Sequence, residues 1–434
     1  MRARRKRFQV IVSACYGSRG DVMPCLTIAA ALARRLEGQA TVVAMANPVF
    51  ENAVAANVRF IGVGSRDEYE CVQRDHASRR DARVVVRYWL DHLETHAERI
   101  LEARADAGRT IVLAHTLDLA VRCVDERAND ECLTCYSIVL SPALLRTPNQ
   151  TIPPFAGESL RCFGRSRWAM RAADCLVDIA FAPQLNAFRA SLGSTKPVKR
   201  VFDEWFLCKA GVFAMYPEYF ERAADAGSRK VFQIDFPQEG GDVNVTGLNA
   251  IRVAREFIDR DDAPTVVFVS ASGNPPFASQ FFATAVKAMR RLAGAKAILL
   301  TRHRDRIGEL PENAIHIDFL PLHLCRDAGL KIAALVHHGT IGCSATALRS
   351  AWPQVVVPAA FDQPYNAALL EAMGAAQIIH MTRLTRTRLV KALKIVFKEE
   401  ARAPETAPRR RANDASSPQA RVAEIIAKEL LQYG

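Results

Sequence analysis

The sequence lacks any apolar run of the length, about 20 residues, that a helix needs to cross a bilayer. Its basic start, residues 1–7, is typical of the beginning of a signal peptide. The apolar segment that follows, Phe8–Tyr16, is short and runs directly into Gly17-Ser18-Arg19-Gly20-Asp21 without a cleavage-like site. We therefore expect a first strand rather than an export signal, and a cytoplasmic protein.

The cysteines do not form a disulfide pattern. Their number, eleven, is odd, and most lie within apolar runs, where a free thiol packs as a small hydrophobic side chain. Cys132-x-x-Cys135 has no second pair to complete a zinc site. The stretch His92–His96, HLETH, is similar to a zincin motif with a misplaced glutamate, and we interpret it as one face of a helix. No metal is expected.

Acidic residues are fewer than basic ones: 46 Asp and Glu against 58 Lys and Arg give a formal net charge of +12. Excess positive charge favours anionic partners. No RNP-like, zinc-finger or arginine-and-aromatic pattern is present, so nucleic acid is not expected. Phosphorylated small molecules and peripheral contact with an anionic membrane, at the inner face, remain candidates. The second is favoured by the basic, proline-broken segment Arg161–Arg171, which contains Trp168.

The length of 434 residues suits about two domains. From Phe8 to Leu140, short apolar strands alternate with helical periodicity, and a second alternating series begins near Thr265. This pattern predicts an α/β protein with two Rossmann-like, doubly wound domains, 1–237 and 238–434, that face each other across a cleft. The second domain is expected to end in a closing helix, Arg421–Leu431. Ligands of such domains favour the carboxyl ends of the strands.

Two segments of the second domain carry chemistry. Ala333–Leu348, AALVHHGTIGCSATAL, predicts a strand, a glycine-containing turn and a helix whose first N–H groups suit a pyrophosphate. Two histidines at a strand end are more often structural than catalytic, although one can add a hydrogen bond or a charge. Further on, the strand Gln354–Pro358 leads to Asp362-Gln363, an acid–amide pair of the kind that holds adjacent sugar hydroxyls.

In this order, the segments resemble the nucleotide-sugar-dependent glycosyltransferases of the GT-B fold, which have a His-His-Gly-Gly-x-Gly-Thr turn, an apolar strand and Asp-Gln-x-x-Asn. The segment Gly17–Pro24, GSRGDVMP, is similar to the Gly-Ser-x-Gly-Asp-Val-x-Pro loop of bacterial members. Within the family the likeness is greatest to the rhamnosyltransferase subunit of rhamnolipid synthesis, through Leu185–Ala187, Pro197–Phe202 and Ala333–Leu348.

The resemblance implies a role for each matching residue. Asp21 stands at the position of the family's general base. A purely structural role, as the N-cap of the following helix, would also explain an aspartate there. His115 ends a strand where plant relatives place the acid that orients their catalytic histidine, which suggests a reversed Asp21–His115 dyad. The donor site would comprise a phosphate-binding Ser272, Arg302 near a phosphate, Phe319 and its neighbour Leu320 at the base, His338, Gly339, Thr340, Gly342, Cys343 and Ser344 at the diphosphate, and Asp362 and Gln363 at the sugar.

Three positions depart from the family pattern. Thr340 replaces the second glycine of the turn, Cys343 its usual small hydroxyl residue, and Ala271 a glycine beside Ser272. A Cβ at position 340 would strain a turn that needs positive φ. We therefore expect either a modified donor pocket or weakened activity.

The resemblance implies an inverting, metal-independent transfer, with a nucleotide sugar as co-substrate and no other cofactor. The expected donor is dTDP-rhamnose and the expected acceptor an apolar alcohol such as a hydroxylated fatty acid. Two alternatives stay open: a UDP-glucose-type transferase acting on a sterol, polyketide or other apolar alcohol, and a catalytically weak nucleotide-sugar-binding partner subunit. An epimerase of the same fold would not explain the Asp21 loop.

Overall fold

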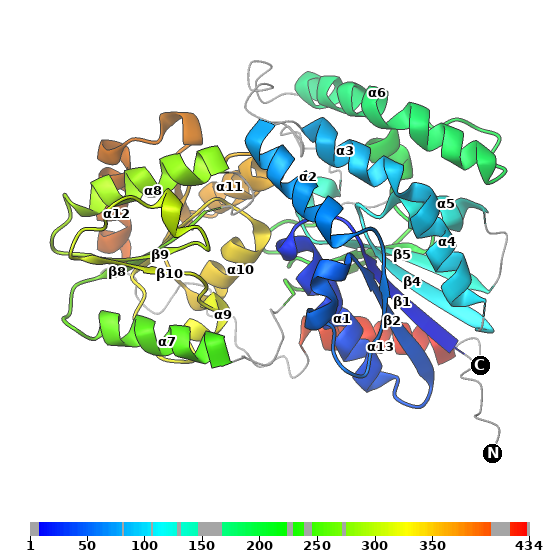
Figure 1. The fold of residues 1–434 in the computed structure, drawn as a ribbon, viewed down its shortest axis with the longest axis horizontal. Helices are drawn as coiled ribbons and strands as arrows, with labels where there is room; N and C mark the ends of the chain where they lie inside the picture. Colours follow the sequence, from blue (N-terminus) through cyan, green and yellow to red (C-terminus); the bar gives the residue numbers. More distant parts are fainter. Residues whose placement is uncertain are drawn as a thin grey trace. The chain divides into compact units, whose positions relative to one another are not determined.

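The computed structural model describes residues 8–79, 82–105, 107–127, 132–145, 167–223, 229–237, 245–270, 275–400 and 417–431. These residues form two compact units, each built on its own parallel sheet (Figure 1). Unit 1 contains the described residues up to 237 together with 417–431, and unit 2 contains residues 245–400. Among the described residues, no helix is long and apolar enough to span a membrane.

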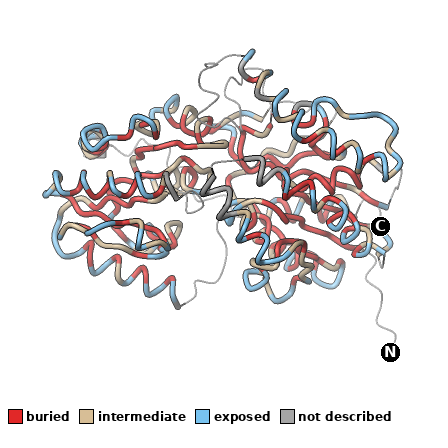
Figure 2. The backbone as a smooth tube through the Cα atoms, turned by 45° about the horizontal axis from the view of Figure 1, so that its top comes forward, coloured by how far each residue is buried: buried red, intermediate tan, exposed pale blue. Residues whose placement is uncertain are grey.

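Unit 1 has a seven-stranded sheet in the order β3-β2-β1-β4-β5-β6-β7, with every neighbouring pair parallel. Its strands are β1 Phe8–Ala14, β2 Ala40–Ala46, β3 Arg59–Gly62, β4 Arg109–His115, β5 Leu133–Val139, β6 Gly211–Ala214 and β7 Lys230–Gln233. Its helices are α1 Arg19–Arg35, α2 Arg66–Arg79, α3 Ala82–Asp91, α4 Leu93–Arg104, α5 Leu119–Arg127, α6 Arg167–Ser191 and α13 Pro418–Leu431. The central strands are buried on both faces, as the continuous apolar runs of the sequence predict (Figure 2).

Unit 2 has a six-stranded parallel sheet in the order β10-β9-β8-β11-β12-β13. Its strands are β8 Thr265–Val269, β9 Lys296–Leu300, β10 Ala314–Ile317, β11 Ala334–His337, β12 Gln354–Val356 and β13 Ala376–Ile378. Its helices are α7 Val245–Ile258, α8 Pro275–Met289, α9 Leu322–Cys325, α10 Ile341–Ser350, α11 Gln363–Ala372 and α12 Arg386–Glu400. One core cluster packs α8 and α12 against the sheet, and a second packs α7, α9 and α10 against it.

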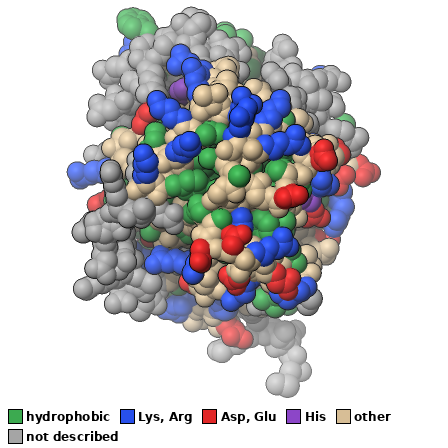
Figure 3. Space-filling view, turned by 90° about the vertical axis from the view of Figure 1, so that its left-hand side faces the viewer, with side chains coloured by type: hydrophobic (Ala, Val, Ile, Leu, Met, Phe, Trp, Pro, Cys, Tyr) green, Lys and Arg blue, Asp and Glu red, His purple; other side chains and the backbone are tan. Residues whose placement is uncertain are grey.

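The excess of basic side chains is visible on the face that carries unit 2 (Figure 3). Lys and Arg side chains are spread over this face among hydrophobic and neutral ones. Helix α12 contributes exposed cations at Arg386, Arg388, Lys391, Lys394 and Lys398. The positive charge on this face is therefore distributed rather than confined to one groove.

The closing helix corrects the expected division of the chain. We assigned it to the second domain, but α13 packs on α1 of unit 1. The face of α13 formed by Val422, Ala423, Ile426, Ala427 and Leu430 is buried. Polar contacts join the same unit, from Gln419 Nε2 to Thr27 Oγ1 at 3.1 Å and from Lys230 Nζ to Glu429 Oε1 at 3.4 Å. The apolar face of α1, not proximity in the chain, determines where this helix lies.

Replacing Ile426 with Ala should therefore destabilise unit 1. Ile426 is fully buried, so the change leaves a cavity between α13 and the rest of unit 1 and should lower the free energy of unfolding by about 2–4 kcal/mol. Its neighbour Ile425 is only half-buried, and Ile425→Ala is the matched control, with a loss of less than half that size. Urea unfolding followed by circular dichroism measures both, and equal losses would show that the α13 interface does not stabilise unit 1.

Candidate functional site

In each sheet, the strand order reverses at one place. In unit 1 the chain moves from β1 outward to β3 and returns to β4 beside β1, and in unit 2 it moves from β8 outward to β10 and returns to β11 beside β8. At such a point the loops after the two central strands part to opposite sides of the sheet and leave room for a ligand. The residues expected from the sequence lie at these points. In unit 1, Asp21 lies in the first turn of α1, after β1, and His115 is the last residue of β4. In unit 2, His338 directly follows β11.

Asp21 lies in the first turn of α1, where the preceding loop fixes its carboxylate. Asp21 Oδ2 accepts hydrogen bonds from Ser18 N at 2.7 Å and Ser18 Oγ at 2.9 Å. Gly17 has φ +107°, and a Cβ there would lie 2.8 Å from the Asp21 side chain. The loop therefore needs glycine at this position. About a third of the Asp21 side chain, 36%, stays exposed, so the carboxylate is held and yet open to solvent.

His115 lies behind Asp21, with its Nε2 3.9 Å from Asp21 Oδ1. Its Nδ1 accepts a hydrogen bond from Leu117 N at 3.3 Å, which places the proton of the neutral ring on Nε2. Nε2 is buried and makes no hydrogen bond among the described residues. Burial lowers the pKa of His115, and the nearby Asp21 carboxylate opposes that shift. The structure thus brings the two expected residues together, with the Nε2 of a neutral imidazole 3.9 Å from the carboxylate, beyond hydrogen-bond distance.

A buried polar network lies beneath this pair, and sequence reasoning missed it. Asp118 accepts hydrogen bonds from Ser13 Oγ at 2.5 Å and from Cys15 N at 3.1 Å. The Ser13 hydroxyl donates its one proton to Asp118. In the hydrogen bond between Ser13 Oγ and His96 Nε2, 2.9 Å long, His96 is therefore the donor. Burial raises the pKa of Asp118 to about 7 and lowers that of His96 to about 3. The network ties the end of β1, just before the Asp21 loop, to the segment after His115.

The side chains of Cys15, His96 and Asp118 lie close enough together to suggest a metal site. The Ser13 hydroxyl, however, lies 2.5 Å from Asp118 Oδ2, 2.9 Å from His96 Nε2 and 3.6 Å from Cys15 Sγ. It therefore occupies the space between the three groups where an ion would sit. Because the hydroxyl satisfies these groups through hydrogen bonds, we interpret the cluster as structural.

In unit 2, the two histidines at the end of β11 have different environments. His337 is fully buried: its Nδ1 accepts from Gly339 N at 3.1 Å and its Nε2 donates to Gln354 Oε1 at 2.9 Å. Burial lowers its pKa to about 3, so it is a neutral structural residue. His338 is partly exposed and donates from Nδ1 to Val269 O at 3.4 Å, across the point where β8 and β11 part. Burial lowers its pKa to about 4.

The turn after His338 leads into the N-terminus of α10. Gly339 has φ +88°, and a Cβ there would lie 3.0 Å from Val356 Cγ1, so glycine is required. Thr340, in contrast, has φ −65° and ψ 152°, an extended conformation that any residue adopts. The strain expected from replacing the second glycine of the family turn is therefore absent.

The first turn of α10 carries the remaining residues expected at a diphosphate. Among the described residues, no hydrogen bond uses the N–H of Ile341 or Gly342, which suits an anion at the helix N-terminus. Gly342 is exposed and has open space around it. Cys343 is half-buried, and the Ser344 hydroxyl donates to Thr340 O at 2.9 Å. Ser344 thus stabilises the turn with its side chain.

Asn366 was not among the predicted site residues, although it belongs to the Asp-Gln-x-x-Asn motif. It is fully buried, and its Nδ2 donates to Gly339 O at 3.1 Å and to Asp362 Oδ2 at 2.8 Å. It therefore joins the histidine turn to the acid–amide pair. Gln363 is buried, and its Oε1 accepts from Ala359 N at 2.9 Å, so its amide nitrogen is the group left for a ligand. Phe361, just before Asp362, has φ +56°, an uncommon conformation for a non-glycine residue.

The remaining expected residues differ in accessibility. Phe319, after β10, is 38% exposed, which leaves its ring able to stack on a base. Its neighbour Leu320 has its side chain buried in the core of unit 2, so its backbone is the part that stays a candidate for contact with a base. Arg302, after β9, is exposed. Ser272 and Ala271 lie outside the described residues.

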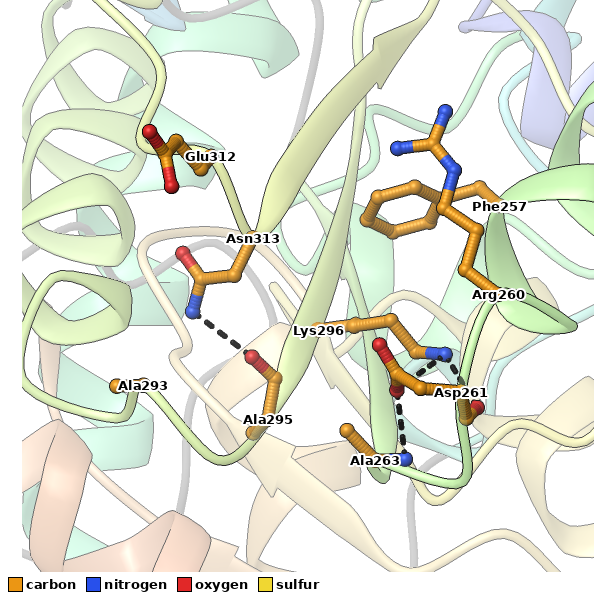
Figure 4. Close-up of a pocket in the computed structure, with 9 residues that line it drawn as sticks. All are labelled: Phe257, Arg260, Asp261, Ala263, Ala293, Ala295, Lys296, Glu312 and Asn313. Carbon is orange, nitrogen blue, oxygen red and sulfur yellow. Dashed lines mark hydrogen bonds and ion pairs between the residues drawn. The ribbon is translucent and has the colours of Figure 1, made fainter.

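A pocket of about 200 Å³ lies elsewhere in unit 2, lined by Phe257, Arg260, Asp261, Ala263, Ala293, Ala295, Lys296, Glu312 and Asn313 (Figure 4). Lys296 begins β9, so this pocket lies at the amino ends of the strands, opposite the loops described above. Lys296 Nζ pairs with Asp261 Oδ1 at 2.9 Å, and Asn313 Nδ2 donates to Ala295 O at 2.8 Å. These polar groups satisfy one another, and we do not assign a ligand to the pocket.

Comparisons with known proteins bear on the fold and the enzyme class. Residues 291–431 match the family described as erythromycin biosynthesis protein CIII-like, C-terminal domain. The chain is 24% identical over 389 residues to glycosyltransferase GtfE of Amycolatopsis orientalis, covering 84% of each chain. It is 39% identical over 74 residues to O-mycaminosyltylonolide 6-deoxyallosyltransferase of Streptomyces fradiae, an alignment that spans 17% of this chain and only 18% of that relative.

Two solved structures are similar over almost the whole chain. The glycotransferase of kitacinnamycin has a TM-score of 0.67 at 19% identity, covering 98% of this chain and 99% of the other. Spinosyn rhamnosyltransferase SpnG complexed with thymidine diphosphate has a TM-score of 0.57 at 17% identity, covering 97% and 100%. The expected fold, two Rossmann-like domains of the GT-B glycosyltransferases, is confirmed. The comparisons support the expected enzyme class, whereas they give no support to the closer likeness to rhamnolipid synthesis.

Replacing Gly17 with Ala should displace Asp21. The new Cβ adds a clash with the Asp21 side chain to the cost of a positive φ, so we expect a loss of about 2 kcal/mol or more in the free energy of unfolding. Gly38 has φ +75° with nothing within 4 Å of an added Cβ, and Gly38→Ala should cost only about 1 kcal/mol. Urea unfolding compares the two, and an equal loss would show that the Asp21 loop yields without strain.

Proposed function

We propose that this protein is an inverting, metal-independent glycosyltransferase. It moves a hexosyl group, rhamnosyl from dTDP-rhamnose, to a hydroxyl of an apolar acceptor such as a hydroxylated fatty acid. The observation that carries the proposal is the Asp21–His115 pair, 3.9 Å apart at the point where the order of the unit 1 strands reverses. The fold and the enzyme class supported by the comparisons agree with it.

In the proposed reaction Asp21 is the general base. Ser18 holds Oδ2, so Oδ1 is the oxygen that accepts the proton of the acceptor hydroxyl. The acceptor oxygen then attacks the anomeric carbon of the donor, and the bond from that carbon to the diphosphate breaks. In the proposal His115, which is buried with its Nε2 3.9 Å from Asp21 Oδ1, does not meet the acceptor and acts only by orienting the carboxylate. This is the reverse of the arrangement in which an acid orients a catalytic histidine.

On the donor side, unit 2 offers donors for the charge that develops on the leaving diphosphate. The N–H groups of Ile341 and Gly342 begin α10, and His338 lies at the preceding strand end. Donors fixed before the reaction stabilise such a charge without reorganisation. In the proposal Phe319 stacks on the base, and Asp362 and Gln363 bind hydroxyls of the sugar. The position of Asp362 is held by Asn366, which links it to Gly339.

The nucleotide and the sugar are proposed from similarity. Two solved structures of similar fold, VinC and SpnG, are described as complexes with dTDP or thymidine diphosphate, and SpnG is described as a rhamnosyltransferase. The likeness of Leu185–Ala187 and Pro197–Phe202 to the rhamnolipid enzyme suggests the lipid acceptor. A UDP-glucose-type transferase acting on a sterol or polyketide is the second candidate, favoured by antibiotic glycosyltransferase relatives. The third candidate is a weak nucleotide-sugar-binding partner subunit. One observation that favoured it, a strained Thr340, is absent because Thr340 is extended.

The direct test incubates the protein with dTDP-rhamnose or UDP-glucose and a panel of hydroxylated lipids and polyketides, with mass spectrometry of the products. Rhamnosylated lipid supports the proposal. Transfer from UDP-glucose would favour the second candidate. Binding of dTDP without turnover of any donor would favour the partner subunit.

Replacing Asp21 with Asn should abolish most of the activity. Without a base at this position we expect kcat to fall by roughly 10²–10⁴-fold, whereas dTDP affinity stays unchanged because unit 2 binds the nucleotide. His115→Phe should cost about tenfold by removing the Nε2–H that faces Asp21. Asp67→Asn, at an exposed carboxylate on α2, is the matched control. Full activity in D21N would refute the role of the base, and full activity in H115F would refute the dyad.

The affinity for dTDP should fall as the pH rises. His338 donates from Nδ1 to Val269 O, so only the protonated ring can also donate from Nε2 to a phosphate. Burial holds its pKa at about 4 in the free protein, and a bound diphosphate raises it; binding therefore takes up a proton and weakens with increasing pH. Calorimetry between about pH 5 and pH 8 measures this slope. In His338→Gln, only the titration of dTDP itself remains, so the part of the pH dependence that His338 contributes should be lost. Identical pH slopes of dTDP affinity in the wild-type protein and the variant would contradict this role of His338.

A further inference from the structure

Helix α6, Arg167–Ser191, carries an apolar surface that faces solvent. Six large hydrophobic side chains are exposed among the described residues, and three of them lie on this helix: Trp168, 77% exposed, Leu176, 55%, and Ile179, 72%. Large exposed apolar side chains that gather on one element mark an interaction surface rather than random exposure.

These side chains belong to one continuous face. Steps of three or four residues along α6 pass through Trp168, Ala172, Leu176, Ile179, Pro183, Ala187 and Ala190, and every member is apolar. All of them are exposed except Ala172, which is half-buried. At a rise of about 1.5 Å per residue, the face extends for about 33 Å. We refer to these seven residues as the α6 face.

The opposite side of α6 is anchored to unit 1, which keeps the α6 face directed outward. Phe181 and Leu185 are buried, and α6 packs against α3 (Figure 1). Arg189 forms a two-pronged ion pair with Glu126, with both contacts at 2.7 Å. Asp178 Oδ1 accepts from Val201 N at 2.7 Å, so this carboxylate turns toward the protein. The exposed face is therefore a property of the folded unit.

Cations lie near both ends of the α6 face. Arg171 is exposed near its start, with its guanidinium 5.7 Å from the Trp168 ring, and Lys196 and Lys199 are exposed just after its end. If a second copy packed on this face antiparallel, Arg171 would meet the lysines of the partner, and a parallel pairing would bring identical cations together. A negatively charged, apolar surface avoids both repulsions and matches the net charge of +12.

We propose that the α6 face docks unit 1 on an anionic lipid bilayer. The helix lies in the plane of the membrane surface, with Trp168, Leu176 and Ile179 among the acyl chains and Arg171, Lys196 and Lys199 at the headgroups. This surface lies on the unit that carries Asp21, so it would bring the proposed base to a lipid-borne acceptor. Docking itself does not depend on the transfer reaction, so the docking proposal and the proposed function can be refuted independently.

The experiment is cosedimentation of the full chain with vesicles of phosphatidylcholine alone or of phosphatidylcholine with phosphatidylglycerol. We expect binding to the anionic vesicles and roughly a tenfold or greater loss of partitioning for the double variant Leu176→Ser/Ile179→Ser. Lys196→Gln/Lys199→Gln should weaken binding severalfold and reduce its sensitivity to salt. Leu248→Ser is the matched control, because Leu248 is 58% exposed on α7 of unit 2.

Thermal unfolding of each variant checks that the fold is retained, and dTDP binding, which uses unit 2, should be unchanged. The proposal is overturned if the wild-type chain does not bind the anionic vesicles or binds neutral vesicles equally. It is also overturned if L248S loses as much binding as the α6 variant. A dimer in the absence of vesicles that dissociates in the α6 variant would instead identify the α6 face as an interface between copies.

Discussion

The parallel pairing of β1 with β4 and of β8 with β11 is the constraint on which the rest of this structure depends. Each pair fixes two loops at one edge of its sheet, at the place where the connecting helices part. A histidine lies at this place in each unit: His115 is buried 3.9 Å from a carboxylate in unit 1, and His338 is partly exposed in unit 2. The chemical difference between the units follows from what surrounds each imidazole, since the backbone arrangement is the same.

Much of this arrangement was predictable, because it depends on local sequence. Continuous apolar runs predicted the buried strands, and the glycine turn with its two histidines predicted the start of α10. The pairing of Asp21 with His115 was also proposed, from the resemblance to relatives in which an acid at the end of this strand orients the catalytic histidine. The network of Ser13, His96 and Asp118 could not be found in this way. Its members are far apart in the chain, and only the packing of α4 against α5 and the end of β1 brings them together.

Other expectations failed because a residue type does not specify its environment. The family turn suggested a strained Thr340, but the chain places the positive φ at Gly339 and leaves Thr340 extended. Amphipathic periodicity predicted that α13 has a buried face, but periodicity carries no information on which partner covers that face.

The position of α13 also affects the order in which the units mature during translation. Unit 1 is discontinuous: its described residues up to 237 are followed by those of unit 2, between 245 and 400, before the chain returns with α13. The face of α1 that receives this helix therefore stays uncovered while the ribosome synthesises more than a hundred further residues, unit 2 itself being residues 245–400. Unit 2 is complete first, and unit 1, which carries Asp21, closes its core last.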